Sequence, residues 1–365
     1  MTIEDHPAAK LRGCLWIKKV SSVYSAGQVS NWLKRIGFPG AISDDMVTHF
    51  DASLENLSIL HRLHLVTFAF ENTPMHYSSH HTMDISPEGL YQRLVVEGKG
   101  SYCFGMNGLF LQMIRGLGYR AYPGAGRINV AEGIDIPEFI SFVHMVIFVQ
   151  PNEGSNTTYF LDASGGGSGL TRPLPLLDGA EVMGASPTEW HTLVKTARTD
   201  SSLSTSVTDE DTPKVEWRLA VSHKKPCGEI SSRIMYSFIE DEYFRRDYEF
   251  ANIGVYSGAT GPDRFFPDNV VCSGCFWLTK EEMAEMGAAD AYDSLLTRYM
   301  GRLGLEKTTL RRHIGSKSET VRTMETEVER AAVLKECFGI EIPEGDLRYI
   351  EGRPPAFDVQ SRPLQ

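Results

Sequence analysis

The sequence predicts an α+β protein, and three observations along the chain lead to this fold class. Apolar side chains recur at helical spacing through about the first hundred residues. After residue 119 the pattern changes to short β-branched and aromatic runs, which clusters of Gly, Pro and Asn separate. The region 226–365 contains both patterns in turn. We therefore expect a helical bundle, an antiparallel β domain and a mixed region, in this order.

Helices are predicted where apolar residues share one face and a capping residue or a glycine marks an end. The first three are expected over residues 25–37, 53–64 and 86–96. A fourth begins near Cys103, and Gly116 and Gly118 bracket its end. Its apolar positions recur every three to four residues on one face, which is typical of a helix anchored in the core: Met106, Leu109, Phe110, Met113, Ile114 and Leu117.

Strands and the remaining helices are predicted from the same two periodicities. The strands are expected over 119–122, 142–149, 157–162, 215–222 and 270–278, and the later helices over 280–286, 290–302 and 319–338. Four parts follow from this order: a loosely attached extension over 1–22, a helical bundle over 23–118, a β domain over 119–225 with a flexible loop near 200–214, and a mixed region over 226–365.

Composition and charge narrow the class of protein. Lys plus Arg number 36 against 47 Asp plus Glu, a formal net charge of −11, which argues against a nucleic-acid or anionic-membrane partner because both need a basic surface. The apolar run at 139–149 is too short to span a membrane and contains Ser141 and His144. The first residues lack a secretory signal pattern and the six cysteines are scattered, so we expect a cytoplasmic protein with reduced thiols.

Cys103 is the first candidate for chemistry. Two glycines and a serine precede it in Gly-Lys-Gly-Ser-Tyr-Cys, and the core-anchored helix follows. The dipole and the free N–H groups of a helix start favour a thiolate. A buried, inert cysteine is the commoner fate of a lone Cys, so this position alone does not decide the matter.

His144 and Asp162 are the second and third candidates. His144 lies in the apolar run Phe-Val-His-Met-Val, where a hydrogen-bonded core histidine is the simpler interpretation. If the strands 142–149 and 157–162 form a hairpin about Glu153, however, His144 lies directly opposite Asp162. A one-residue bulge would change this register. The carboxylate would fix the imidazole tautomer, and the thiol would complete a Cys-His-Asp triad like that of cysteine proteases.

These segments resemble the arylamine N-acetyltransferase family, over most of the chain from about Tyr24 to about Phe338. The resemblance is carried by several motifs in the family's order: Trp32-Leu-Lys-Arg-Ile-Gly37, Phe70-Glu71-Asn72, Gly100-Ser-Tyr-Cys103-Phe-x-x-Asn107-x-x-Phe110, Val143-His144-Met145, Leu161-Asp162, Phe244-x-x-Asp247-Tyr and Phe266-x-x-Asn269-x-Val271-Cys272. The style of the C-terminal region is most similar to that of fungal members. The family implies a helical bundle, a central antiparallel β-barrel and a C-terminal α/β lid.

The resemblance also implies an activity. A family member transfers an acyl group from acetyl-CoA or another acyl-CoA, such as propionyl- or malonyl-CoA, to an arylamine, arylhydrazine or N-hydroxyarylamine. Cys103 would be the nucleophile, His144 would accept and donate the protons, and Asp162 would orient the imidazole ring of His144. Contacts with the cofactor are expected at Ser141, Phe142, Val143, Gly165 and Gly166. No metal is expected, and the oligomeric state is left open.

Two departures from the family's pattern concern the acceptor pocket. The family usually has Glu two residues after the cysteine, where this chain has Gly105. After the aspartate it usually has a Val-Gly-Phe-Gly-like stretch, where this chain has Ala-Ser-Gly-Gly-Gly over 163–167. The three candidate residues are intact.

Other motifs support weaker interpretations. Cys272 and Cys275 form a lone C-x-x-C pair, too little for a zinc site, and are expected to be inert. The histidines at 76, 80 and 81 are expected in a solvated loop. The glycines of 165–169 lack the Lys and the helix of a phosphate-binding loop, and suggest a loop beside the cofactor cleft. Two other functions remain open: a thioester or amide hydrolase that uses the same triad, and a non-catalytic CoA-binding protein.

Overall fold

The computed structural model describes residues 6–131, 136–164, 166–198, 201–203, 214–258 and 264–357. The α-helices of these residues are α1 (Ala26–Arg35), α2 (Asp44–Thr48), α3 (Leu54–Thr67), α4 (Pro87–Leu90), α5 (Cys103–Gly116), α6 (Arg245–Ser257), α7 (Phe265–Asp268), α8 (Lys280–Glu285) and α9 (Glu327–Phe338). The strands are β1 (Phe70–Glu71), β2 (Arg120–Asn129), β3 (Phe139–Gln150), β4 (Tyr159–Leu161), β5 (Leu174–Pro175), β6 (Glu181–Met183), β7 (Glu189–Ala197), β8 (Val215–Lys224), β9 (Ile230–Phe238), β10 (Val271–Trp277), β11 (Met300–Glu306), β12 (Thr309–Ile314) and β13 (Lys317–Thr323).

The central sheet has eight antiparallel strands in the order β5-β4-β3-β2-β9-β8-β7-β6 and curls into a nearly closed barrel. Its interior is aromatic: Phe160 stacks on Phe238 with ring centroids 4.2 Å apart, and the Phe148 ring packs against both. Large apolar side chains of this kind fill a small barrel and hold its strands in register. The sheet continues through β9, beyond residue 225, where the β domain is expected to end. The division of the chain into domains stays a prediction.

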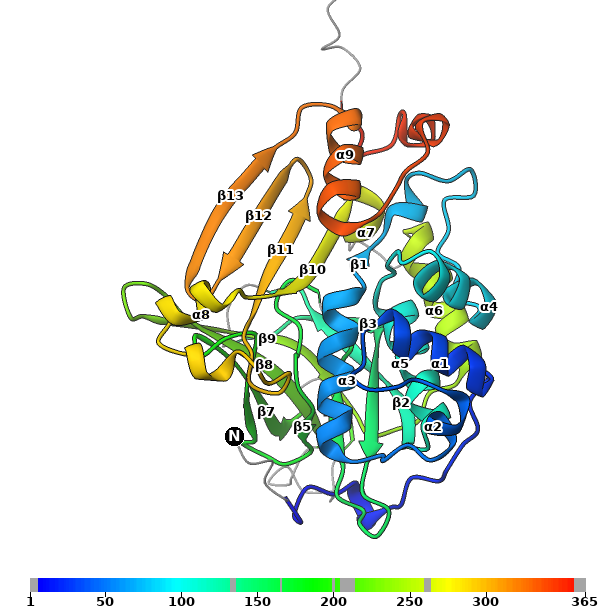
Figure 1. Ribbon diagram of the computed structural model, residues 1–365, viewed down its shortest axis with the longest axis vertical. Helices are drawn as coiled ribbons and strands as arrows, with labels where there is room; N and C mark the ends of the chain where they lie inside the picture. Colours follow the sequence, from blue (N-terminus) through cyan, green and yellow to red (C-terminus); the bar gives the residue numbers. More distant parts are fainter. Residues whose placement is uncertain are drawn as a thin grey trace, which may run out of the picture.

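The second sheet has five antiparallel strands in the order β1-β10-β11-β12-β13. It lies with α9 at one end of the molecule, and α1, α3, α5 and the barrel lie toward the other (Figure 1). The short strand β1 ties this sheet to the helical part, because Phe70 pairs with Ser273 of β10 and also forms a bridge with Ser101. The segment that leads into α5 is thereby fixed between the two parts.

The four helices predicted for the helical part are present, the third as α4 followed by a π-helix over Tyr91–Val96, and α2 is an additional helix that the sequence analysis does not predict. Ser25, Ser53 and Ser86 each accept a hydrogen bond from the first turn of α1, α3 and α4, which satisfies N–H groups that a helix start leaves free. Helix α5 lies at the centre, where the Trp32 and Phe110 rings pack edge to face. The α+β fold class is confirmed.

One predicted helix of the mixed region is wrong, and another begins later than predicted. Residues 290–302 contain a short 3-10 turn at Ala289–Ala291 and then β11. Arg62 donates to the main-chain oxygens of Leu295 and Arg298, and Arg172 donates to that of Leu296, so these carbonyls are bound by distant side chains instead of by a helix. The first part of the helix expected over 319–338 is β13, which forms a hairpin with β12; α9 starts only at Glu327, after the capping residue Thr326.

The segment 6–22 of the expected loose extension is attached along the barrel. The Ile17 N–H donates to Gln150, the Thr158 N–H donates to the Ala9 carbonyl, and Ala9 is buried. Most of the flexible loop expected at 200–214 lies outside the described residues. No helix among the described residues is long and apolar enough to cross a bilayer.

Candidate active site

Cys103 is the first residue of α5 and is buried. The chain ahead of it passes close under β1, where a Cβ at Gly100 would lie 1.9 Å from the Ala69 carbonyl oxygen, so only glycine fits. Arg93 fixes the segment ahead of Cys103. Its side chain donates to the Gly100 carbonyl at 2.7 Å and forms an ion pair with the buried carboxylate of Glu71. No side chain caps the helix start, and the Gly105 N–H donates to the Tyr102 carbonyl at 3.0 Å. Among the described residues the N–H groups of Cys103 and Phe104 have no partner, so these two are available to a ligand.

His144 and Asp162 meet as predicted, although in a different register. The β3–β4 ladder pairs Ile147 with Leu161 and Val149 with Tyr159, so the residue opposite Asp162 would be Val146 and not His144. The shift is two residues, which keeps both side chains on the same face of the sheet because side chains alternate with period two. The His144 Nε2 and an Asp162 carboxylate oxygen lie 2.7 Å apart.

The three predicted residues come together at the junction of α5, β3 and the end of β4. The thiol of Cys103 lies close enough to the imidazole of His144 to contribute to the raised pKa of this histidine. The Cys103 Sγ also lies 3.7 Å from the main-chain oxygen of Val143, which directs the sulfur toward β3. Since Nε2 of His144 faces Asp162, the other ring nitrogen, Nδ1, is the one that faces the thiol.

Asp162 is held by donors on both carboxylate oxygens. Oδ1 accepts from the Asn107 side chain at 2.9 Å and from the Ser164 N–H and hydroxyl at 3.0 and 2.5 Å. Oδ2 accepts from His144 and from the Tyr236 hydroxyl at 2.9 Å. Such a complete set of donors fixes the orientation of a buried carboxylate and stabilises its charged form.

The pKa values of the pair move in opposite directions. Burial alone would lower the pKa of His144, but the charge and the hydrogen bond of Asp162, with a smaller contribution from Cys103, raise it to about 10. Burial alone would raise the pKa of Asp162, but His144, Ser164 and Asn107 together hold it well below its ordinary value. Both groups are therefore expected to be charged at neutral pH when the thiol site is empty of substrate.

A dependence of stability on pH follows. The pKa of His144 is raised from 6.5 to about 10, so its contribution to the free energy of unfolding is full below pH 6.5 and is lost as the pH rises toward 10. Asp162 contributes above its ordinary pKa of 3.8 and loses this contribution as the pH falls. We expect denaturant midpoints of the wild type to fall between pH 6.5 and 10 more steeply than those of Asp162→Asn, in which His144 has no carboxylate partner. Parallel slopes in the two proteins would contradict this prediction.

The residues expected to contact the cofactor are placed as follows. Ser141 is exposed on β3, and Phe142 and Val143 beside it are half-buried. Gly166 lies next to the Phe70 ring, which is 3.9 Å from where its Cβ would be. Gly165 lies outside the described residues.

Four residues that contact Asp162 are not among the predicted site residues, although Asn107 is part of a family motif: Asn107, Ser164, Tyr236 and His61. Ser164 and Asn107 could have been inferred from their distance to Asp162 and Cys103 along the chain. Tyr236 comes from β9, and no local pattern links it to the site. The buried His61 of α3 lies 3.0 Å from the Asp162 main-chain oxygen; since a carbonyl only accepts, Nε2 carries the proton.

The departure at Gly105 has a local cause. A Cβ at this position would lie 2.1 Å from the Ser101 hydroxyl and 2.8 Å from Leu90, so the glutamate usual in the family does not fit here. The chain thus packs Ser101 and Leu90 against the first turn of α5, where the family has a charged side chain.

Other candidate motifs form the support around the site. His76 is buried, against expectation, and its Nε2 lies about 3 Å from the main-chain oxygens of Phe266 and Asn269. Asn72 donates to the same two oxygens and accepts from the Val271 N–H, which joins two of the family motifs. Cys272 and Cys275 are buried in different apolar clusters. Within the described residues no three His, Cys, Asp or Glu side chains gather as metal ligands.

Comparisons with known proteins identify the family of the chain. A family model described as N-acetyltransferase matches residues 53–347. The chain is 26% identical over 346 residues to an N-malonyltransferase, FDB2, of Fusarium pseudograminearum, which covers 90% of this chain and 93% of that protein. It is 32% identical over 157 residues to the arylamine N-acetyltransferase of Mycobacterium bovis, which covers 41% and 49% of the two chains.

The fold is also that of solved structures. The arylamine N-acetyltransferase from M. tuberculosis superposes with a TM-score of 0.63 at 23% identity, covering 88% of this chain and 99% of that one. The match of the family model extends over most of the chain and includes all three residues that meet at the start of α5. The chain belongs to the arylamine N-acetyltransferase family and is an acyltransferase.

Proposed function

We propose that the protein transfers an acyl group from an acyl-CoA to the nitrogen of an aromatic amine, through an acyl-cysteine on Cys103. The observation that carries this proposal is the contact of Cys103 with a histidine whose other ring nitrogen lies 2.7 Å from a fully hydrogen-bonded carboxylate. This arrangement supplies a nucleophile, a proton carrier and the group that fixes the tautomer of the carrier.

In the first half-reaction the Cys103 sulfur attacks the thioester carbonyl of the acyl-CoA. The attack forms the new thioester bond and breaks the bond to the CoA sulfur, which leaves as the thiol with a proton from His144. The N–H groups at the start of α5, which no side chain caps, are available to stabilise the negative charge on the carbonyl oxygen.

In the second half-reaction the amine nitrogen attacks the acyl-cysteine. His144 accepts the proton that the amine loses, and the Cys103 sulfur leaves as the thiolate. Asp162 keeps the imidazole ring in one orientation throughout, since four further donors fix the carboxylate itself. The chain needs no metal for either step.

The acyl group is proposed to be acetyl or malonyl. Malonyl is included because the relative that aligns with 90% of the chain is named as an N-malonyltransferase. Ser141, Phe142, Val143, Gly165 and Gly166 are the residues that we propose to contact CoA, and the acceptor is an arylamine, an arylhydrazine or an N-hydroxyarylamine.

A matrix of acetyl-, propionyl- and malonyl-CoA against aromatic amines and hydrazines tests the proposal, with the release of free thiol as the measurement. We expect thiol release to depend on both substrates and the acylated amine to be the product. Rapid thiol release that does not change with acceptor would instead indicate a hydrolase. Binding of CoA without any turnover would indicate a non-catalytic protein.

His61 is expected to act on the reaction by positioning Asp162. In His61→Leu the hydrogen bond to the Asp162 main chain is lost, and we expect kcat to fall on the order of ten- to hundredfold, the size of effect that a small misplacement of a catalytic group causes. In His61→Gln an amide N–H can replace Nε2, so most of kcat should return. The KM for acyl-CoA should be unchanged in both, and a loss of equal size in both variants would contradict this role.

A further inference from the structure

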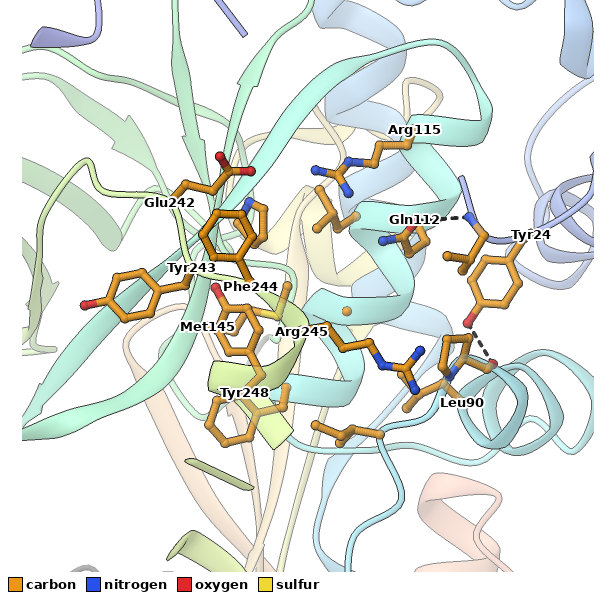
Figure 2. A pocket seen from close by; sticks show the side chains of 17 residues that line it. Tyr24, Leu90, Gln112, Arg115, Met145, Glu242, Tyr243, Phe244, Arg245 and Tyr248 are labelled. Carbon is orange, nitrogen blue, oxygen red and sulfur yellow. Dashed lines mark hydrogen bonds between the residues drawn. The ribbon is translucent and has the colours of Figure 1, made fainter. Parts of the chain in front are cut away.

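A cavity lies beside α5, and neither Cys103 nor His144 lines it (Figure 2). It has a volume of about 190 Å³. An apolar cavity of about 150 Å³ takes up benzene, so this one has room for a single ring with a short chain. The face of α5 that borders it carries Phe104, Gly108, Leu111, Gln112 and Arg115, which share one side of the helix.

The walls of this cavity are apolar and fixed in place. Tyr24 and Tyr248 line the cavity, and their hydroxyl groups donate to the main-chain oxygens of Pro87 and Gly124, each at 2.9 Å. With these polar ends satisfied, both rings present only their apolar faces to a ligand. Leu90 and Leu111 complete the wall.

The polar groups at one end of the cavity are donors. Arg115 donates from Nε and Nη2 to the Ala121 carbonyl only, and no carboxylate of the described residues lies within ion-pair distance of it. Gln112 uses its oxygen to accept from the Val23 N–H, which leaves the amide N–H₂ without a partner in the described chain. Figure 2 shows both side chains projecting from α5 at this end. A half-buried guanidinium beside a free amide donor is complementary to a carboxylate.

The other charged side chains that line the cavity are exposed to solvent. Arg245 is exposed and pairs with Glu249 at 2.7 Å. Glu242 is exposed, so water screens its charge more than that of Arg115. Burial lowers the pKa of Arg115, and the charge of Glu242 acts in the opposite direction.

We infer that this cavity is a binding site for a small aromatic carboxylate, with the carboxylate on Arg115 and Gln112 and the ring among Tyr24, Leu111 and Tyr248. The site is distinct from the thiol site and goes beyond the proposed transfer reaction. A neutral ring would fill the same walls but would leave both donors unpaired, and the acid is therefore the preferred occupant.

Calorimetric titration of the full chain with 3-phenylpropionate tests this inference, with 3-phenylpropanamide as the uncharged control. We expect the acid to bind at least tenfold more tightly than the amide, and to bind equally well when the protein is saturated with CoA. The measurement is of binding, so its result does not depend on whether the transfer reaction is as proposed.

Two variants report on the two ends of the site. Arg115→Met removes the charge and should weaken binding of the acid at least tenfold while leaving that of the amide unchanged. Gly108→Leu fills the cavity from α5 and should abolish binding of both compounds without touching the Arg115–Ala121 hydrogen bonds. Gly108→Ala is the matched control, because its Cβ meets only Leu90 at an ordinary 3.6 Å.

Three outcomes would overturn the inference. Equal affinity for the acid and the amide would show that the donors Arg115 and Gln112 take no part in binding. Unchanged affinity in Gly108→Leu would mean that the compound binds elsewhere. Competition between the acid and CoA, with affinity unchanged in Gly108→Leu, would place the compound in the cleft of Cys103.

Discussion

Cys103→Ala is expected to have no measurable acyl transfer. The substitution removes the only atom that can form the acyl intermediate, and His144 and Asp162 have no step to perform without it. When the wild type is mixed with acyl-CoA and the acceptor is withheld, one acyl group should remain on the protein. Peptide mass spectrometry should place this group on Cys103.

Cys272→Ala and Cys275→Ala are the matched controls. Both thiols are buried, and burial raises the pKa of each, which keeps them in the unreactive thiol form at neutral pH. Each variant should keep the turnover of the wild type once its melting temperature shows that it is folded. An acyl group on either of these cysteines, or turnover that survives in Cys103→Ala, would refute the role of Cys103.

The candidate site could be predicted because its three residues lie in local patterns. Two glycines and a serine ahead of an apolar helix mark Cys103, and a turn-rich stretch between two apolar runs brings His144 near Asp162. The register was wrong by two residues because the turn is centred one residue later than Glu153. The face was nevertheless right, since an even shift preserves the alternation of side chains.

The remaining parts of the site depend on contacts between distant segments. Tyr236 reaches Asp162 from β9 and His61 reaches it from α3, and neither strand nor helix carries a local signal for this contact. The helix expected over 290–302 failed for the same reason, because Arg62 and Arg172 bind the main-chain oxygens that a helix would need. Periodicity describes one element at a time, and these features belong to pairs of elements.

Asp162→Asn is expected to keep the fold and to lower kcat by roughly four orders of magnitude, the loss that a serine protease shows for the equivalent change. An amide has one acceptor and one donor end, whereas all five partners of Asp162 are donors. If the amide N–H₂ faces His144, the imidazole must accept at Nε2 and carry its proton on Nδ1. Nδ1 is the nitrogen that faces Cys103, so it can no longer take a proton from the thiol.

If the amide turns the other way, its N–H₂ meets the side chain of Asn107 and the N–H of Ser164, and the buried donors there lose their acceptor. Both orientations therefore cost activity, and the negative charge that stabilises the imidazolium is absent in each. Tyr236→Phe is the matched control, because it removes one donor and keeps the carboxylate; its kcat should fall far less. Steady-state kinetics with thiol release, alongside thermal melts of all three proteins, makes the comparison. A kcat of Asp162→Asn within tenfold of the wild type would show that the carboxylate only supports the fold.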